Sequence, residues 1–164
     1  MPGQGPIKAI ALDVDGVLTD GAFWWGPDGQ EWKRFSFRDI MGVSIGQKSG
    51  LIFALISGEN TPLVDRYAAK MSITAVHKGC KDKAKALRDF AAESGLQLKE
   101  IAFMGDDIND LGALAVSGLS AAPANAHSSV LKAAKFVAKN PGGQGAVREL
   151  VDHVLKRARQ PKAR

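Results

Sequence analysis

The sequence predicts an α/β fold: a Rossmann-like, doubly wound parallel sheet with a β-hairpin flap and no cap domain. Short apolar runs of strand length alternate along the chain with longer segments of helical period. Strands that alternate with helices pair in parallel, because each helix carries the chain back across a face of the sheet. The apolar runs lie at residues 7–12, 51–56, 73–76, 101–104, 119–121 and 136–138.

Capping signals place helices between these runs. Thr61 followed by Pro62 predicts the start of a helix over residues 63–71, since these residue types favour the cap and first helical positions. A second helical segment, residues 81–94, ends before Gly95, the residue preferred just after a helix. Further helices are expected after Asp107 and over residues 146–158.

One segment, residues 21–37, breaks the alternation. Pro27-Asp28-Gly29 lies between two aromatic-rich extended runs, a pattern typical of a hairpin. All 3 tryptophans fall in this flap, more apolar surface than a hairpin comfortably leaves in water. The hairpin therefore either folds back on its own domain or packs against a second subunit.

The chain has 164 residues, 45% of them hydrophobic, which suffices for one core but not for two ordinary domains. No internal repeat or low-complexity linker is visible. We therefore expect residues 1–164 to form a single domain.

The formal net charge of +5 comes largely from lysines and arginines after the last apolar positions. We expect residues from about 157 to 164 to form a basic, flexible tail. No basic face interleaved with exposed aromatic residues is apparent elsewhere, so we do not expect nucleic-acid binding. A basic balance suits an acidic, phosphorylated substrate.

Cysteine usage and hydropathy predict a cytoplasmic protein without a membrane partner. Cys80 has no second cysteine with which to form a disulfide, and the N-terminal sequence carries no cleavage signature. No stretch approaches the roughly 18 consecutive apolar residues of a membrane-spanning helix.

Two carboxylates, Asp13 and Asp15, follow the first apolar run directly. Ligands of open α/β sheets bind at this edge, outside the carboxyl ends of the strands. Side chains two positions apart project to the same side of an extended chain, and two buried carboxylates need a cation between them. A helix cap or an acidic turn would explain one of these aspartates but not both.

A second acidic motif, GDDIND at residues 105–110, follows the run at residues 101–104. It brings further hard oxygen ligands to the same sheet edge, a donor set that suits Mg²⁺ and not a softer metal. Taken alone, the motif is weak evidence for a metal site. Together with Asp13 and Asp15 it predicts a magnesium site.

Between these motifs, Ser57 and Gly58 follow a strand, and a lysine-rich helix start covers residues 78–85. A hydroxyl at a strand end, adjacent backbone N–H groups and one cation are what a phosphate site requires. A turn serine and solvated lysines are the structural alternatives.

The order of these motifs resembles the haloacid dehalogenase phosphatases: DxDGV, then SG after the next strand, then a lysine that opens a helix, then GDDxxD. The likeness spans residues 7 to about 120. Within that superfamily the chain looks like the 3-deoxy-D-manno-octulosonate 8-phosphate phosphatases and their relatives that act on nine-carbon sugar acids. The matching segments are LDVDGVLTDG at 12–21, the hairpin, FRD at 37–39 and GGQGAVREL at 142–150.

The resemblance implies that Asp13 attacks phosphorus and forms an aspartyl phosphate. Asp15 would be the general acid for the leaving sugar oxygen and then the general base for the hydrolytic water. Mg²⁺ would be held by the Asp13 carboxylate, the Asp15 main-chain carbonyl and Asp106, with Asp110 orienting them. An aspartate with an ordinary pKa of about 3.9 is ionised at neutral pH, so Asp13 is expected to need no activating base.

The resemblance further assigns the phosphoryl group to Ser57, Gly58 and Lys83, with Lys81 as the alternative lysine. Arg38 and Asp39 would bind the carboxylate and hydroxyls of a sugar acid, unless they form a surface salt bridge.

Three departures from the pattern of the octulosonate phosphatases leave the identity of the substrate sugar undecided. The octulosonate phosphatases usually carry arginine where this chain has Glu59, glycine at Ile40 and arginine at Tyr67. Relatives that act on nine-carbon keto-deoxy sugar acids can carry glutamate at the position of Glu59. The expected substrate is therefore 3-deoxy-D-manno-octulosonate 8-phosphate, from lipopolysaccharide biosynthesis, with 2-keto-3-deoxynononate or N-acylneuraminate 9-phosphate as alternatives and Glu59 as a substrate-binding residue.

The intervals between motifs leave no room for a cap domain, so the site should be open within one chain. The family forms tetramers whose neighbouring subunits close the site, which implies a homotetramer with the hairpin flap at the interface. A phosphomutase would need a closing cap. A non-catalytic oligomerising or regulatory module is the alternative from another functional class.

Overall fold

The computed structural model describes residues 5–159. Its strands are β1 (Ala9–Leu12), β2 (Trp24–Trp25), β3 (Glu31–Trp32), β4 (Ile52–Ile56), β5 (Ala75–His77), β6 (Ile101–Met104), β7 (Leu119–Ala122) and β8 (Phe136–Val137). Six of them form a sheet in the order β5-β4-β1-β6-β7-β8, and every neighbouring pair in it is parallel. β2 and β3 form a separate antiparallel hairpin.

The helices alternate with the strands of the parallel sheet, as the sequence predicts. Thr61 caps the second helix by accepting the Leu63 N–H at 3.3 Å, and Gly95 ends the third in the left-handed conformation, with φ of 67°. The helices are α1 (Phe37–Lys48), α2 (Pro62–Lys70), α3 (Lys83–Ser94), α4 (Leu111–Val116), α5 (Ser128–Ala133) and α6 (Ala146–Arg159), with 3₁₀ turns η1 (Leu98–Glu100) and η2 (Ile108–Asp110).

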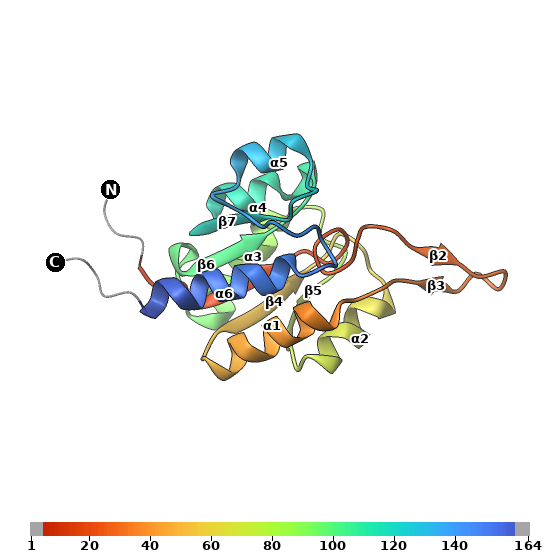
Figure 1. Cartoon of the computed structure of the whole chain (residues 1–164), viewed down its shortest axis with the longest axis horizontal. Helices are drawn as coiled ribbons and strands as arrows, with labels where there is room; N and C mark the ends of the chain where they lie inside the picture. The colour runs from red at the N-terminus through yellow and green to blue at the C-terminus, as the bar shows by residue number, and fades with distance from the viewer. Residues whose placement is uncertain (1–4, 160–164) are drawn as a thin grey trace.

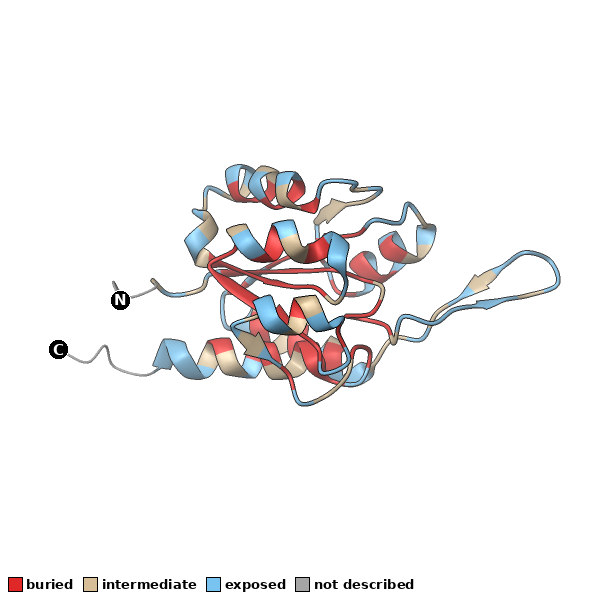
Figure 2. Ribbon diagram, turned by 90° about the horizontal axis from the view of Figure 1, so that it is seen from above, coloured by how far each residue is buried: buried red, intermediate tan, exposed pale blue. Residues whose placement is uncertain are grey.

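Alternate residues of the central strand point to opposite faces of the sheet. Ile10 and Leu12 of β1 belong to a core shared with α1, α2 and α6. Ala9 and Ala11 belong to a second core shared with α3, α4 and α5. All four side chains are fully buried, and Figure 2 shows the buried residues concentrated in the sheet and on the inner sides of the helices. The doubly wound fold predicted from the continuous apolar runs is therefore confirmed.

α1 and α6 lie side by side on one face of the sheet (Figure 1). Gly42 of α1 permits this close approach, because a Cβ at Gly42 would lie only 2.8 Å from the Cα of Arg148. Asp39, in the first turn of α1, is fully buried, and its carboxylate accepts the N–H groups of Gly145 and Arg148 at 3.2 and 3.1 Å. Asp39 therefore fixes the start of α6.

We expect Gly42→Ala to lower the free energy of unfolding by about 1–3 kcal/mol, because the added methyl forces the two helices apart. Gly112 of α4 is the matched control, since a Cβ there would meet the Cβ of Ala84 at 3.4 Å, an ordinary contact. Gly112→Ala should leave stability unchanged or raise it by up to about 1 kcal/mol. Urea unfolding followed by circular dichroism measures both, and equal stabilities would contradict this packing argument.

The hairpin projects from the body of the molecule, on the side opposite the C-terminal end of α6 (Figure 1). Trp24 faces Trp32 across its two strands. Trp25 is 71% exposed, and Trp24 and Trp32 are more than half exposed. The alternative in which the hairpin folds back on its own domain is therefore wrong. The flap is also one residue shorter than predicted, because Ser36 caps α1 and Phe37 begins that helix.

Two expectations about the chain ends change. α6 continues to Arg159, so the first residues of the predicted basic tail, from 157, are helical, while residues 160–164 lie outside the described part of the chain. Over residues 5–159, no helix combines the length and the apolar composition that crossing a bilayer requires. The assignment of residues 1–164 to a single domain stays a prediction.

Candidate active site

The predicted polar motifs meet at the carboxyl ends of β1, β4 and β6. β1 lies between β4 and β6, where the chain reverses its direction of travel across the sheet. Asp13 directly follows β1, and its N–H donates to the carbonyl of Met104 on β6 at 3.0 Å. Open α/β sheets bind ligands at this kind of switch point. A cavity of about 240 Å³ opens there, lined by Asp13, Asp15, Gly21, Gly58, Glu59, Lys83, Asp106, Asp107 and Asn109.

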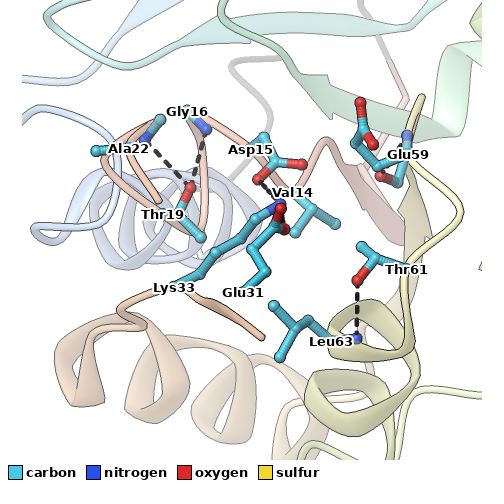
Figure 3. Close-up of polar contacts among 12 residues, drawn as sticks. Val14, Asp15, Gly16, Thr19, Ala22, Glu31, Lys33, Glu59, Thr61 and Leu63 are labelled. Carbon is cyan, nitrogen blue, oxygen red and sulfur yellow. Dashed lines mark hydrogen bonds and ion pairs between the residues drawn. The ribbon is translucent and has the colours of Figure 1, made fainter. Parts of the chain in front are cut away.

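The loop that carries Asp13 and Asp15 is held in shape by its own backbone and by one buried hydroxyl. Thr19 is fully buried, and its Oγ1 accepts the N–H of Gly16 at 3.2 Å (Figure 3). It also accepts the N–H of Gly21 at 3.2 Å. Gly16 has φ of 85° and a Cβ there would collide with the Asp106 carboxylate, so both the turn and the close approach require glycine.

Three carboxylates from two motifs gather beside Lys83. One oxygen each from Asp13, Asp106 and Asp110 lie within 4.8 Å of one another. Lys83 Nζ lies 2.9 Å from Asp13 Oδ1 and 2.7 Å from Asp110 Oδ1, and its side chain is almost completely buried. Lys81 is exposed and does not line the cavity. The fold thus places Lys83, the first residue of α3, in the site in preference to Lys81.

Burial changes the acid strength of these groups. It raises the pKa of Asp13 well above its usual range, although the Lys83 ammonium opposes the rise. Burial and the negative charge of Asp110 raise the pKa of Asp106 to about 6. The prediction that Asp13 has an ordinary pKa is therefore wrong for the protein without a cation in the site, because it took no account of burial.

The charges that line the cavity fit a hard divalent cation. Five carboxylates face one ammonium group, so a phosphate ester would meet strong repulsion without a further positive charge. Every potential ligand is an oxygen atom, the donor that Mg²⁺ prefers. The carboxylates are those of Asp13, Asp15, Glu59, Asp106 and Asp107.

Asp110 does not line the cavity, but it binds residues that do. Its Oδ2 accepts the N–H groups of Asp106 at 2.8 Å and Asp107 at 3.2 Å, while its Oδ1 accepts from Lys83. Both oxygens of this fully buried carboxylate are thus occupied. Asp110 holds the Asp106 loop and the Lys83 ammonium in place.

Ser57 lies behind the cavity wall. It is fully buried, and its Oγ accepts the N–H of Glu59 at 3.1 Å. Gly58 and Glu59 line the cavity, whereas Ser57 does not. The hydroxyl therefore shapes the turn that presents these two residues.

Sequence comparison agrees with this geometry. The sequence profile of the haloacid dehalogenase-like hydrolases matches residues 52–150. This chain belongs to that family. It is 36% identical over 149 residues to the 3-deoxy-D-manno-octulosonate 8-phosphate phosphatase KdsC of Escherichia coli K12, covering 91% of this chain and 79% of the relative. The KdsC of Yersinia pestis is 37% identical over the same length, with 91% and 80% covered.

A solved structure is also similar throughout. The 3-deoxy-D-manno-octulosonate 8-phosphate phosphatase of Moraxella catarrhalis, crystallised with magnesium ion, phosphate ion and a KDO molecule, superposes with a TM-score of 0.89 at 35% identity. The match covers 92% of this chain and 86% of the other. The resemblance to haloacid dehalogenase phosphatases of the octulosonate type, inferred from the motifs, is thereby confirmed.

Within this hydrolase fold, two predicted substrate-binding residues lie away from the cavity. The assignment of Asp39 to sugar hydroxyls is wrong, because its buried carboxylate binds the start of α6. Arg38 lines a separate hollow of about 420 Å³ beside Gly143 and Gln144, so it does not reach the Asp13 cavity of its own chain. Tyr67 is also buried, with its ring stacked on Phe35 at 4.5 Å between centroids.

Four residues were missed by sequence reasoning, and one of them, Gly21, lines the cavity at the end of the segment LDVDGVLTDG. Asp107 and Asn109 line the cavity, and their place in the GDDIND motif was a signal that could have found them. Lys33 lies in the hairpin segment and contacts Asp15, 18 positions away, at 2.7 Å. No local sequence pattern predicts that contact.

Proposed function

We propose that this chain is a Mg²⁺-dependent phosphatase that hydrolyses a phosphorylated 2-keto-3-deoxy sugar acid of the 3-deoxy-D-manno-octulosonate 8-phosphate type. The observation that carries the proposal is the cavity in which Asp13, Asp106 and Lys83 converge at the switch point of the sheet. The activity of the KdsC relatives supports the same reaction class.

In the first step, a carboxylate oxygen of Asp13 attacks phosphorus, and the bond between phosphorus and the sugar oxygen breaks. Asp15 gives a proton to that oxygen, so the sugar leaves as a neutral alcohol. The Lys83 ammonium and the backbone N–H of Gly58 offset the negative charge on the phosphoryl oxygens. The product of this step is an aspartyl phosphate on Asp13.

In the second step, Asp15 accepts a proton from a water molecule whose oxygen attacks the phosphorus of the aspartyl phosphate. The bond between Asp13 and phosphorus then breaks, which returns the Asp13 carboxylate and releases inorganic phosphate. Each cycle therefore restores the protonation state of Asp15.

The Asp13 carboxylate, the main-chain carbonyl of Asp15 and the Asp106 carboxylate would hold Mg²⁺, with Asp110 orienting Asp106. When bound, Mg²⁺ supplies positive charge that keeps Asp13 ionised and neutralises the phosphoryl group. The raised pKa values of Asp13 and Asp106 are the reason why such a charge is needed.

Mg²⁺ affinity should fall as the pH drops below about 6. The folded-state pKa of Asp106, about 6, lies above the ordinary 3.8, so its ionised form costs folding stability at neutral pH. The metal-free protein should therefore gain stability on acidification through this window. Protons compete with the metal there, so the apparent Mg²⁺ affinity should fall about tenfold for each pH unit below that pKa.

Thermal unfolding with and without Mg²⁺, at several values between about pH 5 and pH 7.5, measures both trends. An Mg²⁺-induced rise in melting temperature that is the same at both ends of this range would contradict the prediction.

The relatives support the substrate class, and the cavity limits how much of such a substrate a single chain can enclose. At about 240 Å³ it can enclose the phosphate and the adjoining carbons but not a whole eight- or nine-carbon acid. Glu59 lies at the cavity wall, where its carboxylate can accept hydrogen bonds from substrate hydroxyls. Because this position carries glutamate, 2-keto-3-deoxynononate and N-acylneuraminate 9-phosphates are the second candidate substrates.

A homotetramer would complete the open site. The exposed Trp32 of the hairpin lines an apolar cavity of about 320 Å³ between the flap, α1 and α2, together with Phe35, Phe37 and Leu63 among others. This surface suits a second subunit. Light scattering tests the assembly, and a fully active monomer would contradict it. The cytoplasmic location also stays a prediction.

Phosphate release with Mg²⁺ from a panel of esters tests the proposal. The panel holds 3-deoxy-D-manno-octulosonate 8-phosphate, the two nine-carbon 9-phosphates and common hexose phosphates. Preference for one keto-deoxy acid by at least about tenfold in kcat/KM would support the substrate class. Weak hydrolysis of all esters alike would contradict it, and no hydrolysis of any ester would contradict the phosphatase reaction itself.

A further inference from the structure

Lys33 joins the base of the hairpin to the catalytic loop. Its Nζ lies 2.7 Å from Asp15 Oδ1 and 3.2 Å from Glu31 Oε1. Figure 3 shows the lysine side chain running from the strand that leaves the hairpin up to the Asp15 carboxylate. The Lys33 side chain is only 5% exposed. The cation of this ion pair is thus shielded from water, whereas Arg34, which pairs with Asp20, has an exposed side chain.

The Asp15 side chain has no other hydrogen-bond partner among residues 5–159. It lies between Val14 and Gly16, at the start of a turn in which Gly16 has φ of 85°. Asp15 lines the cavity, whereas Lys33 does not. The position of this carboxylate is therefore set from outside the cavity, by a residue of the flap.

We propose that Lys33 is a positioning residue that holds one oxygen of the Asp15 carboxylate and so presents the other to the reacting oxygen in the cavity. This inference rests on the proposed phosphatase function. It adds Lys33 to the residues on which the reaction depends. It also makes the orientation of Asp15, the general acid and base, depend on where the hairpin lies.

Proton transfer by Asp15 depends on how its carboxylate is oriented. Asp15 must give a proton to the sugar oxygen and later take one from water, and each transfer requires heavy atoms within hydrogen-bond reach. A carboxylate free to rotate on a surface loop spends little time in one geometry, and a small misplacement of a catalytic group can cost about 10²-fold in rate. The Lys33 contact restricts that rotation, while Glu31 holds the lysine from its other side.

The first test compares Lys33→Met, which keeps the length of the chain but removes the charge, with Lys33→Arg. Lys33→Met should lower kcat for the sugar-acid phosphate by about 10–100-fold with a much smaller change in KM, because general acid–base catalysis contributes about 10²–10⁴-fold. Lys33→Arg, which can still bind one carboxylate oxygen, should recover most of the lost rate. Arg34→Met is the matched control and should keep wild-type kcat, since Arg34 pairs with Asp20 at the surface.

The second test asks whether Lys33 acts through Asp15. In an Asp15→Asn background, Lys33→Met should cause no further loss, because the group that it positions can no longer transfer a proton. With p-nitrophenyl phosphate, whose leaving group needs no proton, Lys33→Met should keep the initial burst of nitrophenolate and slow only the later turnover.

The outcomes separate the two claims. If Lys33→Met turned over substrate as fast as the wild type, the positioning role alone would be overturned. The same holds if Lys33→Met lowered kcat by the same factor in the wild type and in the Asp15→Asn background. A wild-type chain that releases phosphate from no ester would overturn the proposed function, and with it this inference.

Discussion

Replacing Asp13 by asparagine should abolish phosphate release, with turnover at least about 10⁴-fold lower, while leaving the fold intact. The amide keeps the size of the side chain and can still accept the Val14 N–H that Asp13 Oδ1 accepts at 2.8 Å. It cannot form the aspartyl phosphate. Phosphate release with saturating Mg²⁺ measures the loss.

The same variant should be more stable than the wild type when no metal is present. Burial raises the pKa of Asp13, so its ionised form costs folding stability at neutral pH, and an amide removes that cost. Mg²⁺ should stabilise the variant less than the wild type, because one ligand has lost its charge. Thermal unfolding in a metal chelator and in Mg²⁺ checks both effects.

Asp28→Asn is the control for the Asp13 variant. Asp28 lies exposed in the hairpin turn, where its Oδ1 accepts the Gln30 N–H, and asparagine can make the same contact. Its activity and stability should match the wild type. Activity of Asp13→Asn within about tenfold of the wild type would show that another group is the nucleophile.

Lys83→Met should have the largest effect on stability. It removes the ammonium that lies within 2.9 Å of Asp13 and 2.7 Å of Asp110, and leaves both buried carboxylates without their cation. Breaking a buried ion pair in this way costs about 3–5 kcal/mol. Mg²⁺ should restore part of the loss, because it brings positive charge back to Asp13.

Lys83→Met should also lower kcat by about 10²-fold or more, since the phosphoryl group loses a fixed positive charge. Lys81→Met is the matched control, because Lys81 is exposed two positions earlier, and its unfolding free energy should change by less than about 0.5 kcal/mol. Urea unfolding and phosphate release measure the pair of variants. Equal effects of the two substitutions would contradict the role assigned to Lys83.

The fold and the central part of the site could be predicted from the sequence because their signals are local. A strand buried on both faces must be continuously apolar, so the runs that became β1, β4 and β6 were visible without any structure. Asp13 follows β1 directly and Asp106 lies two positions after β6, and parallel strands end at one sheet edge. The chain's order alone therefore brought these carboxylates together, and the helix start at Lys83 followed from its motif.

Other features depend on contacts between distant parts of the chain, which no local pattern reports. Asp39 accepts backbone N–H groups more than a hundred positions away, at Gly145 and Arg148, and so serves the packing of α1 on α6 instead of a sugar. The raised pKa of Asp13 arises from burial, which exists only in the folded protein. Short helices such as α5 carry too few residues to show a period.

By itself, then, the sequence determined the order of strands and helices, the edge at which the acidic motifs meet and the reaction class that they suggest. Only the tertiary structure decided which polar side chains face the cavity, that the aromatic hairpin stands away from its own domain, and that Lys33 reaches Asp15. The physical reason is that side-chain partners are chosen by packing in three dimensions, whereas strands and caps are chosen by neighbours along the chain.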